Sequence, residues 1–213
     1  MRITNPDLKR RIIELSYKYH LSHIGSCLTA VDIIAEIYEE KRCYEKFILS
    51  SGHAGLALYC ALEKYEGRNA EELFKKHGVH PNRDIENGIY ASTGSLGHGF
   101  PIALGMAIAD KSKNVYCLIS DGEMAEGSIY ETFNLAKDLQ LNNFHIYVNC
   151  NGYSAYKNVY AYRIADLMSL YQCVDINLRE TTSEPFMGGL EAHYLSLDER
   201  HYNEALSILD KYV

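Results

Sequence analysis

Residues 115–153 read VYCLISDGEMAEGSIYETFNLAKDLQLNNFHIYVNCNGY, and this stretch decides the fold. Its pattern predicts a strand over residues 115–119, an acidic turn, an amphipathic helix and a second strand over residues 144–148. Two apolar runs separated by a Gly-containing turn and a helix are typical of a parallel βαβ crossover. Ligands of such sheets collect at the carboxyl ends of the strands. We therefore expect Asp121 and Asn151, which follow the two strands, to reach one edge of the sheet and share a site.

The composition is that of a globular protein. The chain has 213 residues, of which 47% are hydrophobic and 23% are charged. No linker, repeat or low-complexity tract divides it, so we expect residues 1–213 to form one domain. The formal charge of −7 argues against nucleic-acid binding, which needs clustered Lys and Arg.

Cysteine usage and hydropathy bear on location. No CxxC pair occurs, and metal binding by the thiols is not indicated. The first residues do not resemble a signal peptide, and no apolar run is long enough to span a bilayer. We therefore expect a cytoplasmic protein that does not bind membranes. The cysteines are Cys27, Cys43, Cys60, Cys117, Cys150 and Cys173.

Two helices are predicted at the start of the chain. Asn5 followed by a proline is typical of a capped helix start, and the apolar spacing extends this helix to about Tyr19. The Thr29-x-x-Asp32 pattern predicts the start of a second helix. His23 then lies in the polar loop between the two helices, where it is either a site residue or a solvated loop histidine.

Two Gly-containing turns enter helices further along the chain. Residues 46–50 predict a short strand, and the Ser-Gly-His turn after it brings His53 near a helix N-terminus, where anions are favoured. A helix-capping role for His53 is the alternative. A polar helix is expected over residues 70–77. The loop STGSLGHG at residues 92–99 leads into a helix of small residues, so its backbone can approach a ligand closely. Its glycine spacing matches neither the phosphate-binding loop nor the dinucleotide fingerprint.

The last third of the chain continues the alternation of strands and helices. Residues 153–163 are rich in tyrosine and lack periodicity, so we expect a loop near the site or a contact surface. A short helix over residues 164–170 and a strand over residues 173–178 follow. Ser196 and Glu199 have the spacing of a capping box before a final helix. Together the segments predict an α/β fold with a mostly parallel sheet.

Three oxygen groups could bind a metal. Asp121 offers a carboxylate and Asn151 an amide carbonyl, and the turn at Tyr153 can add a main-chain carbonyl. Oxygen ligands suit Mg²⁺ or Ca²⁺, and Mg²⁺ keeps positions for water and substrate phosphates. The alternative is that the Asp-Gly and Asn-Gly pairs form two ordinary turns.

The motifs taken together resemble a known family. SDGE, then EG, and NCNG with its second Asn 30 residues after Asp121 resemble the thiamine diphosphate motif. The landmarks SHIGS, ILSSGHAGLALY, HP, STGSLGHGFPIALGMAIAD, SDGEMAEG, NCNGYS and EAHY resemble, in order, the amino-terminal, diphosphate-binding half of transketolases. The resemblance extends from about residue 10 to about residue 210. It implies a three-layer α/β/α, thiamine diphosphate-binding fold.

The resemblance also assigns the metal end of the site. It implies a Mg²⁺ ion that bridges the two phosphates of thiamine diphosphate and is held by Asp121, Asn151 and the carbonyl of Tyr153. Gly122 would donate its amide to a phosphate, and Glu123 belongs to the same cofactor-binding motif.

Further cofactor contacts are implied on either side of the metal. His53 and His193 match histidines that contact the diphosphate and nearby substrate atoms. Gly94, Ser95 and Leu96 fall in the loop that meets the aminopyrimidine.

The remaining implied residues face the substrate or a partner. His23 and His80 match substrate-side histidines, and Glu126 matches a glutamate at the subunit interface that pairs with the partner's catalytic glutamate and also belongs to the cofactor site. The expected catalytic set is His23, His53, His80, His193 and Glu126.

The chain departs from the family pattern at several points. Ser120 replaces the first glycine of the motif, His98 stands where Gln is usual, and Ile24 stands where Pro is common. The segment between Asn151 and His193 is shorter than in the family. Because that segment forms part of the substrate side, the usual phosphorylated sugar acceptor is in question.

The resemblance implies a ketol transferase that works with a second chain. Thiamine diphosphate chemistry would move a two-carbon unit from a ketose to an aldose. No part of the sequence matches the pyrimidine-binding domain, so we expect a separate carboxyl-terminal-type subunit, in a two-plus-two heterotetramer. The alternatives are deoxyxylulose-phosphate synthase, an enzyme of specialised sugars that are nucleotide-linked or modified, and a non-catalytic scaffold.

Overall fold

The strands in the described part of the chain form one parallel sheet. The computed structural model of the chain describes residues 3–154, 157–187 and 194–212. Within these ranges the sheet has the order β1-β2-β3-β4, and each neighbouring pair is parallel. Its strands are β1 (Lys46–Leu49), β2 (Val115–Ser120), β3 (Phe144–Cys150) and β4 (Asp175–Glu180).

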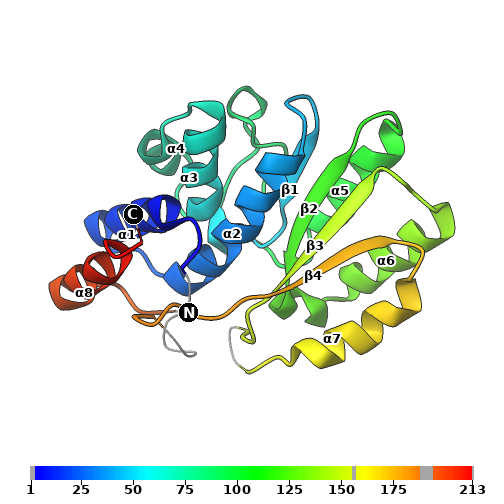
Figure 1. The fold of residues 1–213 in the computed structure, drawn as a ribbon. Helices are drawn as coiled ribbons and strands as arrows, with labels where there is room; N and C mark the ends of the chain where they lie inside the picture. The colour runs from blue at the N-terminus through cyan, green and yellow to red at the C-terminus, as the bar shows by residue number, and fades with distance from the viewer. Residues whose placement is uncertain (1–2, 155–156, 188–193, 213) are drawn as a thin grey trace.

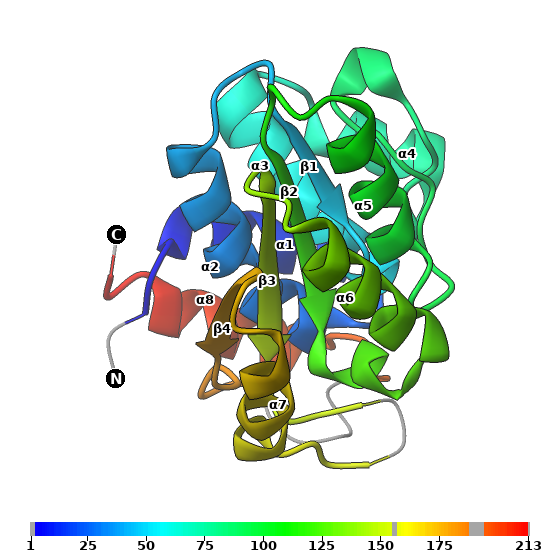
Figure 2. The same ribbon diagram turned by 90° about the vertical axis from the view of Figure 1, so that its right-hand side faces the viewer.

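Helices cover both faces of this sheet (Figures 1 and 2). One face carries α5, α6 and α7, and the other carries α1, α2 and α3, with α4 and α8 packed against them. The three-layer α/β/α architecture and parallel sheet predicted from the sequence are therefore confirmed. The helices are α1 (Pro6–Tyr19), α2 (Ile24–Glu40), α3 (Gly55–Glu66), α4 (Ala70–His77), α5 (Gly99–Ala109), α6 (Gly127–Leu139), α7 (Ala161–Met168) and α8 (Glu199–Leu209). Short 3₁₀ turns are η1 (Gly52–Ala54), η2 (Ile85–Asn87), η3 (Asp121–Ala125) and η4 (Ser169–Tyr171).

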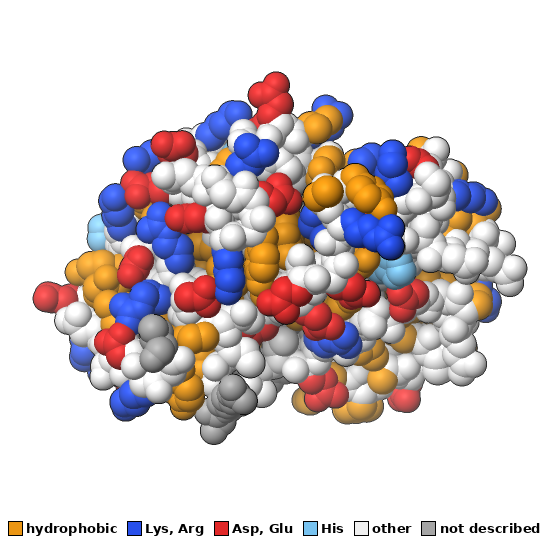
Figure 3. All heavy atoms as spheres, turned by 45° about the horizontal axis from the view of Figure 1, so that its top comes forward, with side chains coloured by type: hydrophobic (Ala, Val, Ile, Leu, Met, Phe, Trp, Pro, Cys, Tyr) orange, Lys and Arg blue, Asp and Glu red, His pale blue; other side chains and the backbone are white. Residues whose placement is uncertain are grey.

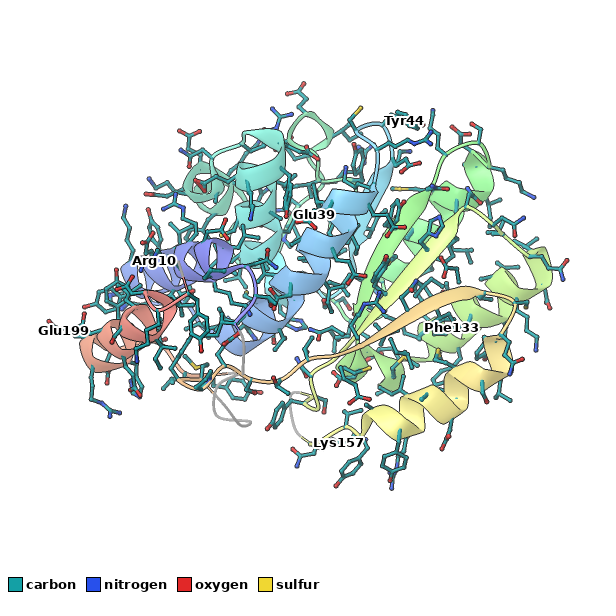
Figure 4. All side chains as sticks on the ribbon, in the orientation of Figure 1. Arg10, Glu39, Tyr44, Phe133, Lys157 and Glu199 are labelled. Carbon is teal, nitrogen blue, oxygen red and sulfur yellow. The ribbon has the colours of Figure 1, made fainter. Side chains whose placement is uncertain are left out.

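The alternation of side chains along β2 divides the core into two clusters. Cys117 and Ile119 pack with α5 and α6, whereas Tyr116 and Leu118 pack with the helices of the opposite face. Every residue of β2 is buried, because a parallel sheet is covered on both faces. Phe133 of α6 points toward the sheet (Figure 4) and is fully buried.

The second helix starts earlier than predicted. It begins at Ile24, after His23 in a left-handed conformation with φ 61°. Thr29 lies in the second turn, and its hydroxyl donates to the carbonyl of Gly25. The capping prediction for Thr29 was wrong because a change of backbone direction at His23 starts the helix without a side-chain cap.

The side-chain cap of the first helix was also predicted wrongly. The helix begins at Pro6 and ends at Tyr19 as expected, but Asn5 makes no side-chain cap. Its amide donates instead to Asp32 Oδ1 at 2.8 Å, which joins the start of α1 to α2.

The last helix is capped by another residue than predicted. Asp198 accepts a hydrogen bond from the amide of His201 at 2.8 Å, while Ser196 donates to the carbonyl of His20. The aspartate lies directly before the helix and its charge suits the helix N-terminus. Tyr202 stacks on Tyr17 at 4.2 Å between ring centroids, so α8 packs on α1.

The surface and the thiols of the described chain are unremarkable. Acidic and basic side chains are interspersed on the face seen in Figure 3. All six cysteines are free. None of the helices in the described ranges is both long and apolar enough to span a bilayer.

A buried lysine ties the chain beyond β4 to the helical layer. Lys9 of α1 is only 3% exposed, and its ammonium lies 2.7 Å from Asp32 and 2.6 Å from Glu184. One cation therefore joins α1, α2 and the segment that follows the edge strand.

Replacing this lysine should destabilise the fold. We expect Lys9→Met to lower the free energy of unfolding by about 3 kcal/mol, because it leaves two neighbouring carboxylates without their cation. Urea unfolding followed by circular dichroism measures this. Lys18→Met, at an exposed ion pair on the same helix, is the matched control and should have far less effect. Equal effects of the two substitutions would contradict the role given to Lys9.

Candidate functional site

The candidate site lies at the carboxyl edge of the sheet. The turns after β1, β2 and β3 meet there, together with the Gly-rich loop before α5. In Figure 4, Lys157 marks this edge, and Tyr44, which precedes β1, lies at the opposite edge.

Glu123 joins three of these segments through its carboxylate. Oε1 accepts hydrogen bonds from Ser50 Oγ at 2.6 Å and from the amide of Gly97 at 3.0 Å. Oε2 accepts from the amide of Ser120 at 2.9 Å. The side chain is fully buried, and this burial raises its pKa, while the hydrogen bonds act in the opposite direction. Both oxygens therefore face protein donors, and the cofactor contact expected of Glu123 stays a prediction.

Close backbone contacts hold the Gly-rich loop against the turn after β1. A Cβ atom on Gly52 would lie 2.5 Å from the carbonyl carbon of Thr93, and one on Gly99 would lie 2.6 Å from Cα of Ser50. Only glycine allows these approaches. The glycines of both motifs thus bring His53 next to the loop that contains Gly94.

The turns after β2 and β3 meet at Asp121. Its Oδ2 accepts a hydrogen bond from the amide of Gly152 at 2.7 Å, where Gly152 has φ +87°. Asn151 Oδ1 accepts from the amide of Tyr153 at 3.0 Å. The two turns therefore share one edge, as the strand pattern predicted.

One oxygen of Asp121 is buried without a partner among the described residues. Oδ1 has no hydrogen bond there, and the residue is 2% exposed. Burial raises the pKa of Asp121 to about 7, against the lowering effect of the Gly152 amide. An unsatisfied buried carboxylate oxygen is costly, and a divalent cation removes that cost. The donors at this edge, a carboxylate and an amide oxygen, fit the chemistry of Mg²⁺.

Three of the four predicted histidines are near this edge. The rings of His23 and His53 lie 5.5 Å apart between centroids. The ring of His80 packs on Gly94, since a Cβ atom on Gly94 would lie 3.1 Å from it. Gly94 in turn contacts the turn that carries His53. His193 lies outside the described residues.

The other predicted residues lie around the Gly-rich loop and the β2 turn. Glu126 packs against Gly97, where a Cβ atom would lie 2.8 Å from Cβ of the glutamate. Ser95 is exposed and Leu96 is half-buried. Gly122 faces Ser154, with an added Cβ at 3.5 Å.

Sequence reasoning missed two polar side chains of this edge. Ser50 was treated as the end of a strand, although it donates to Glu123. Asn149 entered only as part of the NCNG motif and was given no role, although it is buried and donates to Thr29. The signal for Asn149 was its polarity at a buried strand position, two residues before Asn151 and on the same face.

Glu123→Gln should destabilise the fold. Whichever way the new amide turns, its NH₂ group faces the backbone N–H of Gly97 or of Ser120. We expect a loss of about 3 kcal/mol in the free energy of unfolding, measured by urea titration. Glu131→Gln on the exposed face of α6 is the control and should change it little. A variant as stable as the parent would refute the joining role of the carboxylate.

Comparison with known proteins identifies relatives. Residues 13–188 match the family model described as "Transketolase, thiamine diphosphate binding domain". The chain is 32% identical over 165 residues to an apulose-4-phosphate transketolase subunit of Phocaeicola vulgatus, covering 67% of this chain and 58% of that protein. The protein of the same name from Actinobacillus succinogenes is 30% identical over 164 residues, covering 65% and 58%.

Solved structures agree on the fold. The crystal structure of transketolase from Campylobacter jejuni superposes with a TM-score of 0.76 at 20% identity, over 96% of this chain and 42% of that chain. This likeness confirms the predicted thiamine diphosphate-binding fold. The chain spans less than two thirds of the length of these relatives. Since the family model covers most of its residues, the chain belongs to the transketolase family, as a thiamine diphosphate-binding domain.

Proposed function

We propose that this chain is the diphosphate-binding subunit of a transketolase-like enzyme. It uses thiamine diphosphate and Mg²⁺, or Ca²⁺, to transfer a two-carbon ketol unit from a ketose to an aldose. The observation that carries the proposal is the buried Oδ1 of Asp121, which lacks a protein partner among the described residues. Asp121 also contacts the turn after β3, which holds Asn151, through the amide of Gly152. A cation bound by phosphates would complete this oxygen's environment.

Different residues of this chain bind different parts of the cofactor. Asp121, Asn151 and the carbonyl of Tyr153 hold the metal ion. The amide of Gly122 and the side chains of His53 and His193 contact the diphosphate. Gly94, Ser95, Leu96, Glu123 and Glu126 complete the set proposed for the cofactor.

The histidines near the site can donate and accept protons. Thiamine diphosphate, when bound, supplies a nucleophilic carbon and accepts the electron pair released from the ketose. His23 and His53, with neighbouring rings, can hold or deliver a proton to a sugar oxygen near neutral pH. His80 is exposed beside Gly94 and can contact the sugar.

A second chain completes the enzyme. Residues 1–213 form one domain, and a separate pyrimidine-binding subunit supplies the rest of the cofactor site. Both relatives are named as subunits of a transketolase, which supports a divided enzyme. Glu126, beside the Gly-rich loop, faces the partner in a two-plus-two heterotetramer. A cytoplasmic location also stays a prediction.

A specialised sugar is a second candidate for the substrate. The relatives' names specify apulose 4-phosphate, which is not a substrate implied by the general family resemblance. The short segment between Asn151 and His193 also favours a substrate other than the usual sugar phosphates.

Asp121→Asn tests the metal site. We expect at least about 100-fold weaker binding of thiamine diphosphate in the presence of Mg²⁺, because the charged metal ligand is lost, with unchanged circular dichroism. Calorimetry on the complex of this chain with the proposed pyrimidine-binding subunit measures the affinity. Asp138→Asn, on the exposed surface of α6, is the control. Unchanged Mg²⁺-dependent affinity in Asp121→Asn would remove the proposed site.

A further inference from the structure

The hydroxyl of Thr29 lies beside the predicted metal ligand Asn151. Thr29 belongs to the second turn of α2, is 5% exposed and faces the end of β3. Its Oγ1 accepts hydrogen bonds from Asn149 Nδ2 at 3.1 Å and from Asn151 Nδ2 at 3.4 Å. These two asparagines are two residues apart in an extended segment, so their side chains lie on the same face.

The bonding capacity of this hydroxyl selects one orientation of the amide. A threonine hydroxyl has one proton and two lone pairs. The proton is directed at the helix carbonyls of Gly25 and Ser26, at 3.1 and 3.2 Å. Only lone pairs therefore face the asparagines, and only an NH₂ group can approach them favourably. A turned Asn151 amide would bring its oxygen against an oxygen.

The neighbouring asparagine anchors the hydroxyl from the other side. Asn149 Oδ1 accepts a hydrogen bond from Thr181 Oγ1 at 2.6 Å, and Asn149 itself is 3% exposed. Since both ends of this amide are bonded, it cannot turn without losing both contacts. The network thus links α2, β3 and the segment after β4.

The orientation of Asn151 has a consequence at the site. With its NH₂ group on Thr29, its Oδ1 points to the turn after β3 and accepts the amide of Tyr153. The preceding amide of that turn, from Gly152, donates to Asp121. A carbonyl oxygen has two lone pairs, so one on Asn151 can bind a cation beside Asp121.

We propose that Thr29 is a positioning residue that fixes the amide of Asn151 with its oxygen toward the metal ion. The inference rests on the proposed function, because it concerns a ligand of that metal. Removal of a residue that hydrogen-bonds to a metal ligand typically lowers the affinity for the metal about 10- to 100-fold. Thr29 thus adds to the site a side chain from α2, in the helical layer across the sheet from α5 and α6.

Substitutions of Thr29 separate this role from simple helix packing. Thr29→Val keeps the shape and removes the hydroxyl, whereas Thr29→Ser keeps the hydroxyl. Thr132→Val is the matched control, because Thr132 is also buried in a helix and donates to a carbonyl four residues earlier, but lies on α6 across the sheet. The measurement is Mn²⁺ affinity in the presence of thiamine diphosphate, from the signal of free Mn²⁺ in electron paramagnetic resonance.

The expected affinities differ among these variants. Thr29→Val should weaken Mn²⁺ binding by about 10- to 100-fold, while Thr29→Ser and Thr132→Val should stay near the parent value. If Thr29→Val does not fold, Thr29→Ala carries the same expectation. In a background of Asn151→Ala, removing the Thr29 hydroxyl should cause no further loss, because the group that it orients is absent.

Two results would overturn the proposal. One is parental Mn²⁺ affinity in folded Thr29→Val, and the other is an additive loss in the double variant with Asn151→Ala. Asp121→Asn, measured in the same assay, separates this failure from failure of the proposed function. If Asp121→Asn also binds Mn²⁺ normally, the metal site itself is wrong. If only Asp121→Asn loses affinity, the site stands and the role of Thr29 does not.

Discussion

The buried carboxylate of Glu123 is the interaction on which the carboxyl edge of the sheet depends. A buried charge is tolerated only when strong hydrogen bonds replace water. Here the donors come from the turn after β1, from the Gly-rich loop and from the start of the β2 turn, at Ser50, Gly97 and Ser120. Because one group binds all three, their relative positions are fixed. The positions of His53 and Asp121 depend on this arrangement, because both residues lie in the segments that Glu123 joins.

Asp121 and Glu123 lie two residues apart, but the hydrogen bonding of their carboxylates differs. Both are buried at the same turn, yet the two oxygens of Glu123 have protein donors, whereas Asp121 Oδ1 has none among the described residues. The Glu123 carboxylate thus joins segments of the fold, whereas the Asp121 carboxylate is suited to binding a cation. Two ordinary turns would not require a buried carboxylate oxygen, so this contrast favours the metal interpretation of the motif.

The two helical layers contribute different parts of the site. The layer with α5 and α6 supplies the Gly-rich loop and Glu126, which face the pyrimidine side in the proposed function. The layer with α2 supplies His23, whose ring lies beside that of His53, and Thr29, which faces the end of β3. The site therefore depends on the sheet to hold both layers in register, and on Lys9 to keep the segment after β4 close to α2.

The sequence by itself determined the parallel sheet, most of its helices and the meeting of Asp121 with the Asn151 turn. These follow from local rules, since apolar periodicity sets each element and parallel strands bring their carboxyl ends together. Only the tertiary structure decided what Thr29 and Glu123 contact. Thr29 meets asparagines 120 and 122 residues away, and Glu123 meets Ser50 at a separation of 73. A local pattern carries no signal for such partners, and it therefore gave Thr29 the role of a helix cap. The packing of α2 on the sheet, with its start set by the backbone of His23, gave Thr29 its place beside Asn151.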